Sequence, residues 1–170
     1  MRKLPLHRLS FWRSQNLRSC FLPALAILCA ATTTCAAQNA QERGTWHAAN
    51  STARSITGDI ALANEKLLIN FASFTIAEIR DLQQAELSAA FDVVTGGPGT
   101  GHLYRLNIPA TQKFLRKNSL CASDNTQWMA TYVAGRNLQI AFFSGQTPPV
   151  MTFDALASST NLCGTYSYVK

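Results

Sequence analysis

The chain has 170 residues, of which 47% are hydrophobic and 14% charged, and its 15 basic and nine acidic residues give a formal net charge of +6. Five of the basic residues lie within the first 19 positions, where no acidic residue occurs, so residues 38–170 carry a net charge of 10 − 9 = +1. Because a nucleic-acid surface needs a clustered excess of Lys and Arg, nucleic acid is excluded as an expected partner. The one remaining basic cluster, Lys113, Arg116 and Lys117, is predicted to be a solvated loop or a short helix face.

Residues 1–37 have the order of a cleavable signal peptide: a basic stretch, then an apolar stretch over residues 20–31, then small residues over 32–37. Cys35 and Ala37 stand at the −3 and −1 positions of the predicted cleavage site. Twelve apolar residues rise only about 18 Å as a helix, against a hydrocarbon core of roughly 30 Å, so no stable membrane span is expected. A lipid anchor fits poorly, because Cys29 follows Leu28 and Cys35 follows three threonines. We therefore expect a periplasmic or secreted protein that begins near Gln38.

The cysteine count after cleavage predicts one disulfide. Three of the five cysteines lie in the predicted signal, which leaves Cys121 and Cys163. An even pair in an oxidising compartment is expected to be bonded. The bridge would close a loop of about 42 residues and stabilise the fold by about 4 kcal/mol.

Residues 38–170 are predicted to form a single β domain, because short β-branched stretches recur between turn residues. Strands are expected over residues 55–62, 66–71, 74–79, 101–108, 127–134, 138–144 and 163–169. Turns at 63–65 and 135–137 predict two hairpins, and residues 81–91 predict a short helix with an apolar stripe of Leu82, Ala85 and Ala89. The expected fold is a small antiparallel barrel or sandwich of about seven to eight strands.

The glycine-rich stretch 96–102 (GGPGTGH) is one residue away from the phosphate-binding loop of nucleotide triphosphatases. His102 replaces the lysine that reaches the phosphates, and Leu103 replaces the hydroxyl that binds Mg²⁺. A strand is predicted after it, instead of a helix whose N-terminus could face phosphate. We therefore expect a flexible glycine loop between two elements and no nucleotide cofactor.

Gly44-Thr45-Trp46 resembles the G-x-W at the first strand of lipocalins and avidin-like barrels. The resemblance implies a closed barrel with the tryptophan at one end and room for one small apolar ligand. The alternative is that Trp46 is an ordinary core residue of an N-terminal strand.

Residues 98–104 (PGTGHLY) resemble the G-S-G-x-x-Y loop of the periplasmic C-type lysozyme inhibitors, with Thr100 in place of serine. That resemblance implies that Thr100 and Tyr104 contact a partner's active cleft. The alternative is that Tyr104 lies on the core face of its strand with Leu106 and Ile108. The Y-x-C that this family carries elsewhere is missing.

A broader likeness runs through SITGDI at 55–60, NSLC at 118–121, AFFSG at 141–145 and CGTYSY at 163–168. These landmarks resemble a family of small exported bacterial β-proteins of unknown function. The resemblance supports a β fold, a disulfide and export, and it leaves the chemistry open.

No catalytic, cofactor or metal constellation is expected. Residues 38–170 hold two histidines, His47 and His102, whereas a zinc site needs three or four ligands, and no spacing selects a pair among the nine carboxylates. We therefore predict a non-enzymatic binding module that acts on another macromolecule, with residues 95–101 and 145–161 as candidate loops. A lipocalin-like carrier of a small apolar ligand and a lysozyme-inhibitor-like protein are the alternatives, and an enzyme ranks below them.

Overall fold

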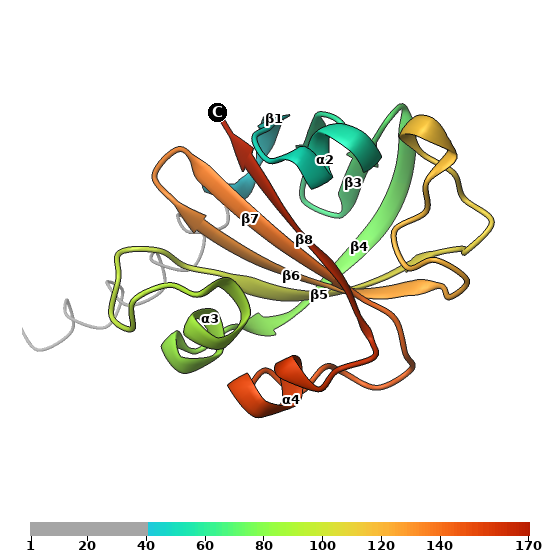
Figure 1. Cartoon of the computed structure of the whole chain (residues 1–170). Coiled ribbons are helices and arrows are strands. Elements are labelled where there is room, and N and C mark those ends of the chain that lie inside the picture. The colour runs from blue at the N-terminus through green and yellow to red at the C-terminus, as the bar shows by residue number, and fades with distance from the viewer. Residues whose placement is uncertain (1–40) are drawn as a thin grey trace, which may run out of the picture. The chain divides into compact units, whose positions relative to one another are not determined.

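Eight antiparallel strands form a closed barrel in which each strand pairs with the next and the last pairs with the first. The computed structural model describes residues 41–170, so the signal predicted over residues 1–37 lies outside the described residues. The prediction of a small antiparallel β fold is confirmed as a barrel (Figure 1). The strands are β1 (Gly44–Ala48), β2 (Ile60–Leu62), β3 (Lys66–Ile69), β4 (Ala72–Asp81), β5 (His102–Ile108), β6 (Thr126–Ala134), β7 (Asn137–Phe143) and β8 (Leu162–Val169).

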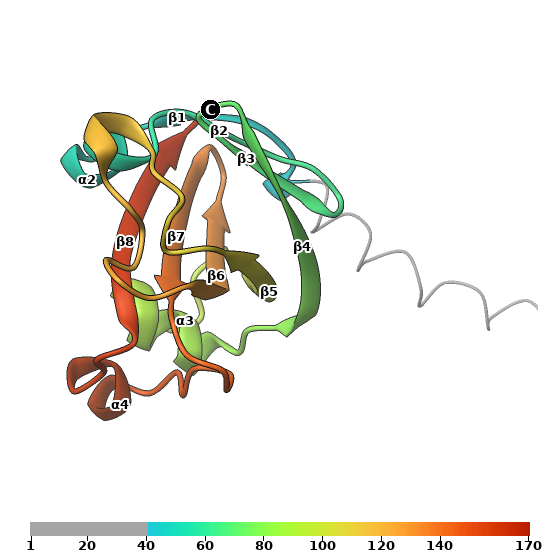
Figure 2. The same cartoon turned by 90° about the vertical axis from the view of Figure 1, so that its right-hand side faces the viewer.

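Three short helices and one 3₁₀ turn connect the strands. They are α2 (Ser51–Ile56), α3 (Gln84–Phe91), α4 (Phe153–Ala157) and η1 (Leu115–Lys117). In both views α2 lies at one end of the barrel, and α3 and α4 lie at the other (Figures 1 and 2). Within residues 41–170, no helix is both long and apolar enough to cross a membrane.

Large side chains fill the barrel interior. Alternate residues of each strand point inward, and Tyr104, Leu106 and Ile108 share the inward face of β5, in agreement with the alternative interpretation of Tyr104. The largest fully buried residues of this core include Trp46, Phe142, Tyr166 and Tyr168.

A second core lies outside the barrel, beneath α3 and α4. Leu87 and Phe91 of α3 pack there with outward-facing residues of β5–β7, among them Trp128 and Phe143. The stripe predicted for this helix was wrong in part, because Ala85 is exposed. Since α3 and α4 cover this side, β6 and β7 are buried on both faces, whereas β1–β3 keep an uncovered outer face.

The strand predicted over residues 55–62 is wrong in its first half. Asn50 accepts a hydrogen bond from Ala53 N (2.8 Å) and so caps a helix, α2, that runs to Ile56. Gly58 then reverses the chain with a φ of +63°, and only Ile60–Leu62 pairs as a strand. The helix cap at Asn50 therefore decides the local structure, although the β-branched residues that follow favour a strand.

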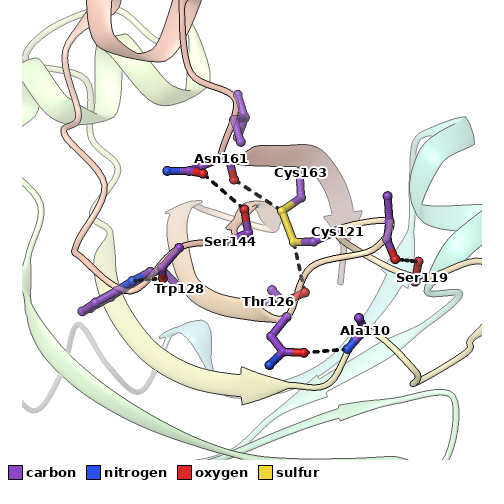
Figure 3. Close-up of a disulfide and its surroundings, with 12 residues drawn as sticks. Ala110, Ser119, Cys121, Thr126, Trp128, Ser144, Asn161 and Cys163 are labelled. Atoms are coloured by element: carbon purple, nitrogen blue, oxygen red, sulfur yellow. Dashed lines mark hydrogen bonds between the residues drawn. A yellow bond between two sulfur atoms is a disulfide. The ribbon is translucent and has the colours of Figure 1, made fainter.

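The segment 145–161, expected as an open loop, contains α4, whose first turn is capped by Thr152. Ser144 N donates to Asn161 O (2.9 Å), which joins the two ends of the segment. Next to this contact, Cys121 and Cys163 are bonded with a Cα separation of 4.8 Å, which confirms the predicted disulfide (Figure 3).

Candidate functional site

The β3–β4 hairpin ends in a two-residue turn that exposes an aromatic side chain. Asn70 and Phe71 occupy this turn with φ values of +47° and +70°. The strand predicted over residues 66–71 therefore stops two residues early, at Ile69. A turn with positive φ at both positions favours Asn-Gly, and a bulky residue in this conformation is rare. Among the described residues, Phe71 is the only large hydrophobic one with a positive φ, and its side chain is 103% exposed.

An apolar groove of about 440 Å³ lies beside Phe71, on the uncovered outer face of β1–β3. Its floor comes from three strands in register, with Thr45 opposite Ala61 and Ala61 opposite Leu68. Leu115 of η1 also lines the groove, and Leu68 is 39% exposed. We call this surface, lined by Ala61, Leu68, Phe71 and Leu115, the hairpin groove.

A basic cluster, which we call the basic rim, flanks Leu115 of the hairpin groove in sequence. Lys113, Arg116 and Lys117 are exposed, which confirms the predicted solvated basic cluster. The 3₁₀ turn η1 packs on α2, where Asn118 Nδ2 donates to Ser55 O (3.3 Å), and this contact brings Arg54 into the rim. Arg54 and Arg116 line a common hollow. Arg54 was not expected near this cluster, because the sequence predicted no helix over residues 51–56.

The one carboxylate that lines the hairpin groove is engaged locally. Asp59 accepts hydrogen bonds from Ala48 N (2.9 Å) and from His47 Nδ1 (2.8 Å). The backbone hydrogen bond from Ala48, followed by the bond from His47, holds the pKa of Asp59 below its usual value. The face formed by the groove and the rim therefore combines apolar surface with an excess of positive charge.

Thr100 and Tyr104, the predicted loop contacts, lie in different environments. Tyr104 is 6% exposed, and its side chain lies in the barrel interior with Leu106 and Ile108, where the alternative placed it. Thr100 is half-buried and pairs with Val133 through two backbone hydrogen bonds of 3.0 and 2.7 Å. The two side chains do not share an exposed loop surface.

The glycine loop before β5 is closely packed. A Cβ atom added at Gly99 would lie 2.1 Å from the Tyr132 ring, and one at Gly101 would lie 2.0 Å from Thr131 O. The expectation of a merely flexible bridge was therefore wrong for these two positions. Glycine is required there because two backbone segments and a ring approach too closely for any side chain.

A buried polar cluster, which sequence reasoning missed, surrounds Glu42. This side chain is 3% exposed and accepts hydrogen bonds from His102 Nδ1 (2.7 Å), Tyr104 Oη (2.7 Å) and Thr131 Oγ1 (2.8 Å). Burial, and then the charge of Glu42, raises the pKa of Tyr104. Burial by itself lowers the pKa of His102. The hydrogen bond to Glu42 and the negative charge of Glu42 raise this pKa by more, so its net shift is upward. No local pattern marks this cluster, because its members are 60 to 89 positions from Glu42.

Trp46 lies on β1 and is fully buried, and its Nε1 donates to Glu42 O (2.7 Å). A carrier of the lipocalin type needs free space among the inward residues. Trp46, Met129, Phe142 and Tyr166 occupy that space here, and their packing argues against a ligand held inside the barrel. No family model, curated protein or solved structure matches this chain.

Proposed function

We propose that this protein is a non-catalytic binding module that acts outside the cytoplasm and holds a segment of a partner protein on the hairpin groove and basic rim. The observation that carries the proposal is Phe71, which is fully exposed and has a left-handed backbone at a turn position that glycine would occupy at lower free energy. Strain of this kind concentrates at functional sites, and exposed aromatics are frequent anchors of interfaces.

The chemistry of the face defines the partner segment. The groove accepts an apolar side chain, because Ala61, Leu68 and Leu115 contribute apolar surface to its lining. The rim carries Arg54, Lys113, Arg116 and Lys117, so carboxylates on the η1 side of that side chain would be attracted to it. We therefore infer an acidic segment with one central apolar or aromatic residue.

A protein fits this face better than a membrane does. A lipid surface binds a broad apolar face, whereas the groove beside Phe71 is also lined by polar groups, among them Asp59 and Asn70, which would lose their hydrogen bonds to water in a membrane. An open groove of about 440 Å³ can receive an apolar side chain of a partner, and its polar lining residues, among them Thr45 and Asn70, can pair with the partner's backbone. Vesicle binding is accordingly an outcome that would contradict the proposal.

The test places a photo-crosslinking phenylalanine analogue at position 71 of the exported protein in its own cells. Phe153, which is 60% exposed on α4, provides the matched control position. We expect one discrete crosslinked protein from position 71 and none from position 153. Equal crosslinking from both positions would contradict the proposal, as would flotation of the protein with anionic vesicles.

The second measurement uses the crosslinked protein in purified form. Replacing an aromatic anchor costs about 2 kcal/mol or more of binding free energy, so Phe71→Gly should weaken binding by at least about thirtyfold. Phe153→Gly should leave the affinity unchanged, and Arg116→Ala should weaken binding mainly at low salt. Unchanged affinity in Phe71→Gly would remove the hairpin groove as the site.

The proposed location outside the cytoplasm is supported by two observations. Residues 1–37 have the basic, apolar and small-residue order of a signal peptide, and Cys121 and Cys163 form a disulfide. The intact mass of the protein recovered from a cell envelope or medium should correspond to a chain that begins near Gln38. A mass that retains Met1 would contradict export with cleavage.

A further inference from the structure

A bulge in β4 brings two carboxylates to one place beside a buried histidine. Glu78 and Asp81 are three positions apart, and in a regular strand they would point to opposite faces. The pairing of β4 with β5 shifts between Glu78 and Arg80, so that Glu78 stands opposite Tyr104 and Asp81 opposite His102. The extra residue reverses the alternation, and ligand atoms of Glu78, Asp81 and His102 all lie within 4.8 Å of one another.

His102 is held in an orientation that suits a metal ligand. Its side chain is 1% exposed, and its Nδ1 lies 2.7 Å from Oε1 of the buried Glu42. Glu42 is itself fixed by Tyr104 and Thr131. A carboxylate that accepts the Nδ1 proton of a histidine fixes the tautomer and leaves Nε2 free to coordinate, as is usual around metal-bound histidines.

The free nitrogen faces the two carboxylates at a distance typical of neighbouring ligands. His102 Nε2 lies 3.4 Å from Asp81 Oδ1. Two ligands bound at about 2.0–2.1 Å in a tetrahedral arrangement are about 3.4 Å apart. A ligand oxygen of Glu78 lies within 4.8 Å of both groups, and Asp81, which is 62% exposed, and Glu78, which is also exposed, can adjust to a bound ion.

We propose that Glu78, Asp81 and His102 bind one divalent transition-metal ion of the zinc type, with Glu42 as the positioning residue for His102. One imidazole nitrogen and two carboxylate oxygens match the ligands that zinc takes in proteins, and a fourth position remains for water or for a group of a partner. This site is independent of the hairpin groove, and either proposal stands if the other fails.

The test uses the mature protein with its disulfide intact, freed of metal by a chelator and titrated with Zn²⁺ by calorimetry and with Co²⁺ by visible absorption. We expect one ion per chain and, with Co²⁺, the intense bands of a four-coordinate site. Asp81→Asn and Glu78→Gln should each weaken Zn²⁺ binding by at least about tenfold. These two side chains are exposed, so both variants are expected to fold.

Asp92→Asn is the matched control, because Asp92 is an exposed carboxylate outside the cluster and asparagine tolerates its positive φ of 52°. It should bind as the wild type does. Glu42→Gln should weaken the affinity by about tenfold to a hundredfold and still bind one ion, because it acts through His102. Binding that is substoichiometric in the wild type, or equal in Asp81→Asn and Asp92→Asn, would overturn the proposal and leave the cluster as an ion network of protonated His102.

Discussion

Lys170 Nζ lies 4.3 Å from the centroid of the Trp46 ring and also donates to Gln41 O (2.7 Å) and Arg43 O (2.8 Å). Through these contacts the residue after β8 holds the chain at the start of β1. The contact matters because β1 and β8 share only two residue pairs, His47 with Val169 and Ala48 with Tyr168. Closure of the barrel at this seam therefore depends on side chains as well as on the backbone ladder.

Replacing Lys170 should weaken that closure. Lys170→Met keeps most of the aliphatic stem and removes the charge, so it should lower the free energy of unfolding by about 1–2 kcal/mol, through loss of the cation–π contact and the two hydrogen bonds. Urea denaturation followed by Trp fluorescence measures the change. Lys113→Met, at an exposed position of the basic rim, should alter stability by less than about 0.5 kcal/mol. An equal loss in both variants would contradict the role of the contact.

Phe71→Gly should stabilise the fold while it removes the proposed anchor. A left-handed backbone costs a non-glycine residue about 1–2 kcal/mol, and the fully exposed ring offers no burial in return. Because glycine also gains entropy in the unfolded chain, we expect a net gain of about 0.5–1 kcal/mol in chemical denaturation. Phe153→Gly, in the first turn of α4, should be destabilising. A loss of stability in Phe71→Gly would show that the ring supports the fold.

Gly101→Ala should be strongly destabilising, although it adds a single methyl group. The new Cβ would lie 2.0 Å from Thr131 O and 2.7 Å from Leu87 Cδ2, and neither a backbone oxygen nor a packed core residue can move freely. We expect a loss of about 3 kcal/mol and a lower melting temperature by circular dichroism. Thr95→Ala, at an exposed position of the same loop, should have little effect. A neutral Gly101→Ala would mean that the loop is loosely packed.

The ion pair between Arg80 and Glu86 should make stability depend on pH. Arg80 donates to both carboxylate oxygens of Glu86 at 2.7 Å, and this bond is the main cause that lowers the pKa of Glu86 below 4.5. The stabilisation is complete above the unfolded-state pKa and is lost as the pH falls through the lower folded-state pKa. Glu86→Gln should therefore be less stable than the wild type at pH 7, and the difference should shrink below about pH 4. A difference that stays constant from pH 7 to pH 3 would contradict this linkage.

The disulfide should contribute more than any of these side chains. Changing Cys121 and Cys163 together to alanine opens a loop of 42 residues and should lower stability by about 2–4 kcal/mol. The double variant avoids a free thiol that could form mixed disulfides. The free energy of unfolding of the wild type with and without reductant should reproduce the same difference.

The sequence by itself determined the features that depend on near neighbours. The inward face of β5 followed from the alternation that places Tyr104, Leu106 and Ile108 on one side of the strand. The β6–β7 hairpin followed from Gly135, which adopts a φ of +58°. The disulfide followed from a count, because two cysteines outside the predicted signal peptide allow only one pairing. Each of these inferences needs only the alternation of residues along one strand, the residues of one turn, or the number of cysteines.

Tertiary structure alone decided the groups that face one another. Glu42 joins His102, Tyr104 and Thr131 across separations of 60 to 89 residues, and nothing within any short window marks it as buried. Similarly, the bulge in β4 places Glu78 and Asp81 beside His102, although nothing in the spacing of these three residues along the chain relates them. A bulge depends on how two strands fit, because one extra residue is tolerated only if the partner strand still pairs on both sides of it.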